Sequence, residues 1–133
     1  MENEASVAID SAMDIVTARQ KGRALAVEIG FNGSDLTLIA TAISEVARNI
    51  VDHAKRGEII LAPVHQGNKR GISITARDEG PGILDVNLAM QYGYSTRRGL
   101  GVGLPGARWL MDEFEINTQI GKGTIVAMKK WLH

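Results

Sequence analysis

The sequence contains no cysteine, and this absence excludes several kinds of site. A thiol nucleophile, a disulfide framework and a zinc site with cysteine ligands all need that side chain. The sequence also lacks an apolar run long enough to span a bilayer. Its opening residues, MENEASVAID, are acidic and lack the apolar segment of a secretory signal. We therefore expect a cytoplasmic protein that does not enter a membrane.

An excess of either charge is missing too. Lysine plus arginine and aspartate plus glutamate number 15 each, so the formal net charge is zero. This balance argues against nucleic acid or an acidic membrane as the main partner. With 133 residues, of which 44% are apolar, the chain is long enough to form one domain over residues 1–133 with a real hydrophobic core.

Hydrophobic periodicity and turn residues predict the order of the secondary-structure elements. We expect helices over 12–29, 34–54 and 105–114, a short helix over 85–91, a glycine-rich loop over 91–103, and strands over 5–9, 58–66, 71–77, 115–119 and 124–131. The helices come first and most strands pair as hairpins. This order favours an α+β fold with two layers, in which helices cover one face of a mixed or antiparallel sheet.

Several single residues predict where these elements end. Ser11 with Asp14 forms a capping pair for the first helix, which stops at Gly30. Ser34 is expected to cap the second helix, and Gly57 to follow its end. Proline cannot donate a ladder hydrogen bond, so Pro63 indicates an edge strand or a bulge. The core members expected from the first helix are Met13, Ile15, Val16, Leu25 and Ile29.

The second helix carries two faces of different chemistry. One stripe is apolar and consists of Leu36, Ile39, Ala40, Ile43, Ala47 and Ile50. Glu45, Asn49 and Asp52 fall on the opposite side, three and four residues apart, and so project together. A solvated face more usually carries lysine–glutamate pairs. A carboxylate followed one turn later by an uncharged amide therefore makes this face a candidate site, with a solvated face as the alternative.

Two glycine clusters follow the strands. Asp78-Glu79-Gly80-Pro81-Gly82 directly follows a strand, where an acid can line a pocket, although these residues also suit an ordinary turn. In Gly99-Leu100-Gly101-Val102-Gly103-Leu104, alternate glycines allow a close backbone approach to a ligand. The helix that we expect to begin at Pro105 adds its positive end. A phosphate cradle and a flexible loop both remain open.

Two familiar nucleotide motifs fail in this region. Gly101, Gly103 and Gly106 match G-x-G-x-x-G by letter, but the polar stretch YSTRRG precedes them instead of a strand. No acid follows about 20 residues later at a strand end, so a Rossmann site is rejected. The Walker pattern is absent, and Gly121-Lys122-Gly123-Thr124, which comes nearest to it, suits a hairpin turn.

Taken together in this order, these motifs resemble the GHKL superfamily of ATPases and kinases. The residues concerned are Glu45, Asn49 and His53, then Asp78, Gly80 and Gly82, then Gly99, Gly101 and Gly103, then Gly123 and Thr124. The phrases AISEVARNI, DEGPGI, YSTRRGLGVGLPGARWLMDEF and GTIVAMKKWL resemble more narrowly the switch-protein serine kinases of the bacterial stressosome, the RsbT type. The resemblance implies a Bergerat fold with a mixed sheet, helices on one face, and nucleotide between the helices and a lid.

The resemblance also implies roles for single residues. Glu45 matches the general base, Asn49 the ligand of Mg²⁺, and Asp78 the acceptor for the adenine amino group of ATP. Gly80 and Gly82 correspond to the backbone at the base, and Thr124 to a further hydrogen bond near adenine. The residues that correspond to the lid over the phosphates are Arg98, Gly99, Leu100, Gly101, Val102, Gly103 and Leu104. The alternative for Arg97 and Arg98 is that both are solvated loop arginines without a role in the site. His53 and Asp52 are not assigned to catalysis.

The resemblance implies a protein serine/threonine kinase that phosphorylates STAS-domain scaffold and antagonist proteins. Phosphorylation in relatives releases the kinase, which then activates a downstream regulator such as a PP2C-type phosphatase. Two alternatives stay open: an ATP-gated protein-binding module, and an anti-sigma factor kinase. A histidine kinase module is disfavoured because the sequence carries no phosphoacceptor or dimerisation helices.

Overall fold

The computed structural model describes residues 4–82 and 103–133. The elements in this part of the chain are β1 (Ala5–Ile9), α1 (Ala12–Ile29), α2 (Ser34–His53), β2 (Gly57–Gln66), β3 (Lys69–Asp78), α4 (Gly103–Leu110), β4 (Glu113–Gln119) and β5 (Gly123–Trp131). Within these ranges, no helix combines the length and apolar character needed to cross a bilayer.

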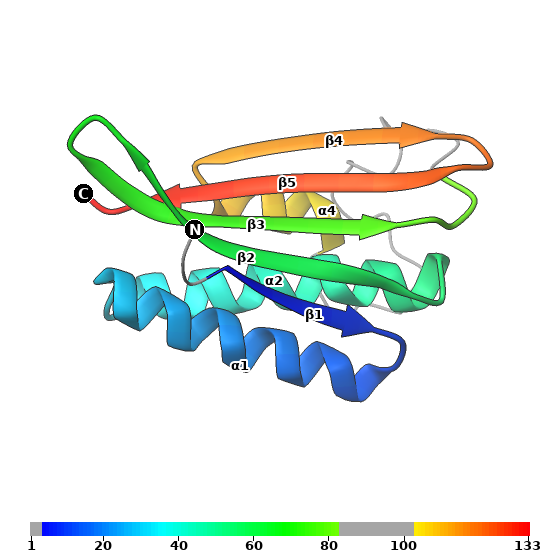
Figure 1. Ribbon diagram of the computed structural model, residues 1–133, viewed down its shortest axis with the longest axis horizontal. Coiled ribbons are helices and arrows are strands. Elements are labelled where there is room, and N and C mark those ends of the chain that lie inside the picture. The colour runs from blue at the N-terminus through cyan, green and yellow to red at the C-terminus, as the bar shows by residue number, and fades with distance from the viewer. Residues whose placement is uncertain (1–3, 83–102) are drawn as a thin grey trace.

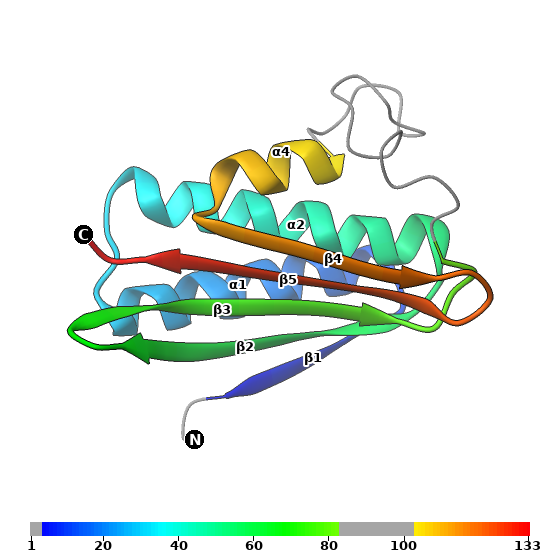
Figure 2. The same cartoon turned by 90° about the horizontal axis from the view of Figure 1, so that it is seen from above.

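The strands form one sheet in the order β1-β2-β3-β5-β4 (Figure 1). The three helices lie on one face of this sheet, as Figure 2 shows from above. The predicted α+β fold with two layers is therefore confirmed. All four strand pairings are antiparallel, so the mixed sheet implied by the resemblance is not what the structure shows. For β1 and β2 the reason is that α1 and α2 run in opposite directions and return the chain to the end of the sheet where β1 finished, so that Gly57 pairs with Ile9.

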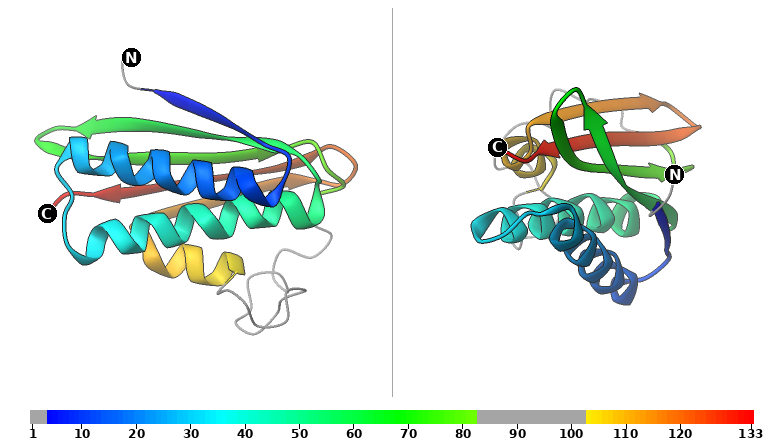
Figure 3. Two further views of the ribbon diagram at one scale, coloured as in Figure 1. Left: turned by 90° about the horizontal axis from the view of Figure 1, so that it is seen from below. Right: turned by 60° about the vertical axis from the view of Figure 1, so that its left-hand side comes forward.

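Helix α2 lies between the other two helices. Figure 3, left, shows α1 on one side of α2 and α4 on the other, all beneath the sheet. The predicted stripe faces the core, since Ile39 and Ile43 are fully buried and Ile50 is 1% exposed. Isoleucines of β2 and β3, including Ile59, Ile72 and Ile74, are fully buried against it. Because α4 covers a second side of α2, that helix also buries Ser44 and Glu45.

Most predicted ends of the first two helices are correct. Ser11 and Asp14 form a capping box, and Gly30 ends α1 with a φ of 125°. At α2, however, Gly33 holds the N-cap and Ser34 is the first helical residue. The helix ends at His53 with Ala54 as its C-cap, in agreement with the predicted end at residue 54, and Gly57 is the first residue of β2.

One further prediction about packing was wrong, and a second is correct for only part of a strand. Met13 is 69% exposed, because it lies in the first turn of α1 on the side away from the sheet. Strand β2 has no bulge in its pairing with β3, but β1 flanks it only from Gly57 to Leu61, so the part of β2 that contains Pro63 has an open edge. Pro63 is tolerated because the pairing with β1 ends at Leu61, so no described strand needs the missing amide of Pro63.

Helix α4 differs at both ends from the prediction. It begins at Gly103, two residues before Pro105, and ends at Leu110. The chain then enters the sheet, where the Asp112 amide donates to the Lys129 carbonyl at 3.0 Å, and Phe114 belongs to β4. The helix predicted over 85–91 and the loop predicted up to residue 102 lie outside the described residues.

Candidate nucleotide site

The Glu45 carboxylate lies between α2 and the start of α4. Its side chain is 8% exposed. The Oε1 atom accepts a hydrogen bond of 3.0 Å from the Gly103 amide, and Oε2 accepts one of 3.0 Å from Arg48 Nη1. A carboxylate at the first amide of a helix meets the positive end of the helix dipole. The predicted base and the last glycine of the predicted cradle are therefore in direct contact.

Asn49 follows one turn after Glu45 on α2 and is half-buried. Among the described residues, no side-chain hydrogen bond to its amide is formed. Asp52 and His53 are exposed in the last turn of the helix. The predicted polar face is thus divided into a buried part at Glu45, an intermediate part at Asn49 and a solvated end.

Asp78 ends β3 on the face of the sheet that carries the helices. Strand alternation places it on the same side as Ile74 and Ala76. Its Oδ1 atom accepts a hydrogen bond of 2.9 Å from the Gly80 amide. The turn predicted at this position is therefore formed, and within the described residues the second carboxylate oxygen makes no hydrogen bond.

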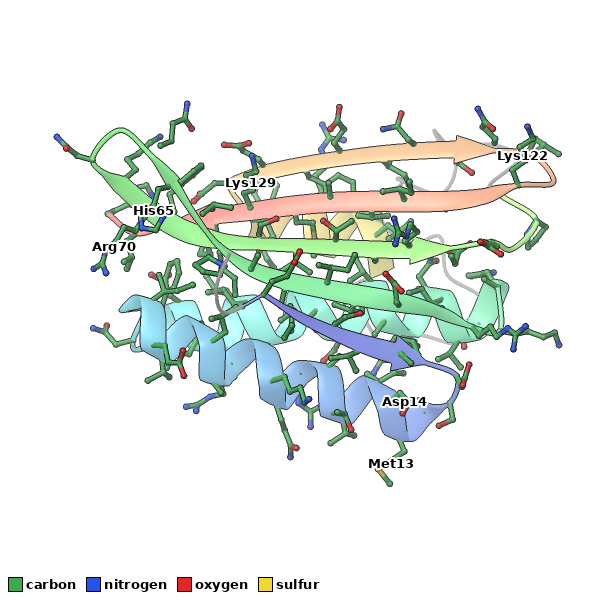
Figure 4. All side chains as sticks on the ribbon, viewed as in Figure 1. Met13, Asp14, His65, Arg70, Lys122 and Lys129 are labelled. Carbon is green, nitrogen blue, oxygen red and sulfur yellow. The ribbon has the colours of Figure 1, made fainter. Side chains whose placement is uncertain are left out.

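Thr124 is the direct cross-strand partner of Asp78. It is 5% exposed, and its Oγ1 lies 2.9 Å from Oγ1 of Thr118, its partner on β4. Asp78, Thr124 and Thr118 thus form a row across three strands at one end of the sheet. Figure 4 shows Lys122 at this end and His65 and Arg70 at the other.

The two glycines after Asp78 connect this row with α2 and with the turn between β4 and β5. A Cβ on Gly80 would lie 2.6 Å from Cβ of Ala54, the C-cap residue of α2. Gly82 has a φ of +82°, and a Cβ there would lie 2.5 Å from the Gln119 carbonyl oxygen. These glycines allow the segment after β3 to pack closely against the end of α2 and against the turn between β4 and β5. Their predicted contact with a base remains an expectation.

These contacts bring the ends of the motifs to one region of the fold. Glu45 contacts Gly103 at the start of α4, and Ala54, the C-cap residue of α2, packs against Gly80 beside Asp78. Leu104 is 6% exposed and belongs to the core, so its side chain is not available to a ligand. The remaining cradle residues, Arg98, Gly99, Leu100, Gly101 and Val102, lie outside the described residues, as does Arg97.

Sequence reasoning missed two residues of this region. Arg48 was not selected, although its position three residues after Glu45 is one at which helical side chains meet. Thr118 was not selected either. Its contact with Thr124 depends on the β4–β5 register.

A surface cavity of about 190 Å³ lies elsewhere, between the end of α1 and the hairpin of β2 and β3. Its lining includes Leu25, Ile29, His65 and Arg70 but none of the predicted site residues. Leu25 and Ile29 are only 8% and 7% exposed. Because none of the predicted site residues lines it, this cavity is not the predicted nucleotide site.

The fold and the motif order define an ATPase class, and comparison with known proteins agrees. Residues 10–130 match the family model described as histidine kinase-like ATPase domain, and the chain belongs to this family. The chain is 48% identical over 132 residues to the serine/threonine-protein kinase RsbT of Bacillus subtilis, with 99% of both chains covered. It is 36% identical over 121 residues to an anti-sigma F factor of Thermoanaerobacter, with 86% of this chain and 83% of that protein covered.

Solved structures confirm the fold. The crystal structure of the RsbU and RsbW domains of Rv1364c from Mycobacterium tuberculosis matches with a TM-score of 0.63 and 22% identity, over 96% of this chain and 31% of that chain. The mycobacterial sensor histidine kinase MprB matches with a TM-score of 0.57 and 16% identity, over 96% and 97% of the two chains.

Proposed function

We propose that this chain is a protein serine/threonine kinase that uses Mg-ATP to phosphorylate STAS-domain proteins of a bacterial stress-signalling complex. The 48% identity to the kinase RsbT over nearly all of both chains supports this function. The structural observation that carries it is the buried Glu45 carboxylate at the N-terminus of α4. A proton acceptor thus lies beside a helix end that suits phosphate oxygens.

The nucleotide base is assigned to the row of polar side chains at the end of the sheet. The Asp78 oxygen that makes no hydrogen bond to a described residue is the acceptor for the adenine amino group, and Thr124 lies next to it. Guanine presents an oxygen at that position. Two acceptors would then face each other, so the site discriminates against GTP.

The phosphates are assigned to the positive end of α4. Gly103 begins this helix, and its amide already donates to an anionic oxygen, that of Glu45. A phosphate oxygen carries the same kind of charge and accepts the same kind of hydrogen bond. Gly99, Gly101 and Arg98, which precede this helix, are proposed to complete the contacts.

The residues present also fit a magnesium ion. Asn49 offers an amide oxygen that is half-buried, lies one turn from Glu45 and makes no hydrogen bond within the described residues. Mg²⁺ prefers oxygen ligands and usually keeps several waters beside substrate phosphates, so one protein ligand suffices. The ion would offset the charge of the triphosphate.

In the transfer itself, the substrate hydroxyl oxygen forms a bond to the γ-phosphorus while the bond from that phosphorus to the bridging oxygen breaks. ADP leaves with the bridging oxygen and its electron pair. The hydroxyl proton passes to the Glu45 carboxylate. Because a serine hydroxyl barely ionises at neutral pH, this acceptor lowers the barrier as the new bond forms.

Transfer from labelled ATP to a purified STAS-domain protein tests the proposed function. Glu45→Gln keeps an acceptor for the Gly103 amide but cannot take a proton, so we expect transfer to fall by about 10²–10⁴-fold. Binding of Mg-ADP, measured by calorimetry, should be nearly unchanged. Glu58→Gln is the matched control, because Glu58 pairs with Arg77 and not with α4. Undiminished transfer by Glu45→Gln would show that Glu45 is not the base.

A second candidate is an ATP-gated protein-binding module. The hydrogen bond between Glu45 and Gly103 favours it, because nucleotide at the start of α4 would act on a contact between two helices. Similarity to an anti-sigma F factor adds a sigma factor as a possible client. Capture of a STAS-domain protein, a PP2C-type phosphatase and a sigma factor, each with and without ATP, separates these partners. Capture that is equal for wild type and Asp78→Asn at all nucleotide concentrations would contradict gating.

A further inference from the structure

The two hydrogen bonds of the Glu45 carboxylate come from different parts of the fold. Arg48 lies on the same helix, three residues further on, and its Nη1 holds Oε2 at 3.0 Å. Gly103 lies on α4, and its amide holds Oε1 at 3.0 Å. One donor therefore belongs to the same helix as Glu45, whereas the other depends on the position of α4.

The Gly103 amide is also the donor to which a phosphate oxygen of the nucleotide would bind. A backbone amide carries one hydrogen, so it cannot serve a carboxylate and a phosphate oxygen fully at the same time. The proposed function places phosphate at this end of α4. Once phosphate accepts from Gly103, the Glu45 Oε1 atom loses its partner and Arg48 alone still orients the carboxylate.

The other end of α4 is held independently of Glu45. The Lys130 ammonium donates to the carbonyl of Leu110, the last residue of α4, at 3.1 Å. Lys130 belongs to β5 and is 8% exposed. Replacement of the Glu45–Gly103 bond by a bond to phosphate therefore leaves α4 attached to the sheet, and Glu45 stays close to the place where the phosphates are bound.

We propose that Arg48 is a positioning residue for Glu45 in phosphoryl transfer. Its guanidinium holds Oε2, so that Oε1, after phosphate has taken the Gly103 amide, stays directed at the start of α4 and accepts the proton of the substrate hydroxyl. This inference rests on the proposed function and adds to it the group that orients the base. In the sequence, Glu45 and Arg48 form the pattern E-x-x-R within SEVAR.

A purely structural role for the pair predicts something different. An i,i+3 ion pair on a solvated helix face affects helix stability only slightly. Here the Glu45 side chain is 8% exposed and that of Arg48 23%, and the carboxylate is the one assigned to catalysis. A structural role would change the melting temperature, whereas a positioning role changes the turnover number and depends on the chemistry of residue 45.

The experiment compares Arg48→Met and Arg48→Lys with the wild-type chain in transfer to the STAS-domain protein. Methionine keeps much of the aliphatic stem and removes the donors, so kcat should fall on the order of ten- to hundredfold while KM for ATP changes little. Lysine keeps one charged donor and should restore part of the loss. Arg77→Met removes the 2.8 Å pair of Arg77 with Glu58, which lies away from α4, and is the matched control with unchanged kcat.

A double-mutant cycle separates positioning from structural damage. If Arg48 acts through Glu45, then adding Arg48→Met to Glu45→Gln changes the residual rate by less than about twofold. An equal loss in both backgrounds would overturn the inference, as would a kcat for Arg48→Met within about twofold of wild type. Melting curves of each variant report any loss of folding.

Failure of this inference and failure of the proposed function give different results. If the wild-type chain transfers phosphate, Glu45→Gln is impaired and Arg48→Met is fully active, only the role of Arg48 is wrong. If the wild-type chain transfers no phosphate to the STAS-domain protein, or Glu45→Gln is fully active, the proposed kinase mechanism fails and the role of Arg48 fails with it.

Discussion

Lys130 and Leu110 connect the sheet with the helix layer. The Lys130 ammonium, on a residue that is 8% exposed, donates at 3.1 Å to the carbonyl oxygen that ends α4. A cation at a helix C-terminus also meets the negative end of the helix dipole. Glu45 contacts the opposite end of the same helix. The eight residues of α4 are thus bounded by a carboxylate from α2 and an ammonium from β5.

The first prediction concerns this attachment. Lys130→Met keeps the apolar stem but leaves the Leu110 carbonyl without its partner. We expect the free energy of unfolding to fall by about 1–3 kcal/mol. Lys129→Met is the control, because Lys129 (Figure 4) is the neighbouring residue of β5 and points to the other face of the sheet. Urea denaturation measures both variants, and equal losses would show that the contact with α4 contributes nothing.

The second prediction concerns nucleotide recognition by Asp78. Asp78→Asn keeps an oxygen for the Gly80 amide but replaces the negatively charged acceptor proposed to bind the adenine amino group. We expect the Kd of Mg-ADP to rise by about ten- to hundredfold, since hydrogen bonds to charged groups contribute about 1.5–3 kcal/mol. Calorimetry measures this change, and Glu79→Gln, on the exposed neighbour, is the control. An unchanged Kd would remove Asp78 from the site.

The third prediction tests why glycine is needed at position 82. Gly82 and Gly121 have almost the same φ, +82° and +80°, but only at Gly82 would a Cβ meet another atom, the Gln119 carbonyl oxygen at 2.5 Å. Gly121→Ala therefore measures the conformational cost alone, about 1 kcal/mol. Gly82→Ala should lose about 1–3 kcal/mol more from the forced shift of the backbone. Thermal unfolding of the two variants gives the difference, and equal losses would contradict close packing at Gly82.

The fourth prediction concerns the packing of α1 on α2. A Cβ on Gly22 would overlap Cδ1 of Ile43, a side chain that is fully buried. We expect Gly22→Ala to destabilise the fold, although alanine favours a helix by about 1 kcal/mol. Ile43→Val alone should cost about 0.5–1.5 kcal/mol. Because valine lacks Cδ1, the double variant should be more stable than the sum of the two single effects by about 1 kcal/mol. Strict additivity would contradict the contact.

Local signals explain which parts of the fold the sequence predicts well. The capping pair of Ser11 and Asp14 and the terminal Gly30 mark both ends of α1 without help from the rest of the chain. The hairpins β2–β3 and β4–β5 are also local, because a short turn connects each pair. The predicted end of α4 was wrong, because the hydrogen bond from the Asp112 amide to the Lys129 carbonyl of β5 competes with another helical turn.

Contacts between distant segments explain what the sequence could not predict. By resemblance, the motif order predicted that Glu45, Asn49 and Asp78 belong to one site. Periodicity alone placed Glu45 on a polar face, whereas α4 packs there and buries it. The row formed by Asp78 and Thr124 depends on the pairing of β3 with β5, which brings together two residues that lie 46 positions apart in the sequence.

Pro63 and the short first strand have a consequence for contacts between molecules. Strand β1 accompanies β2 only as far as Leu61, so the remaining length of β2 has one side that no described strand covers. A bare strand margin of this kind attracts extended segments of other chains, and a proline removes one of the amides that such a segment would need. Pro63 therefore leaves this part of β2 with one backbone donor fewer, which makes pairing between the sheets of two molecules less favourable.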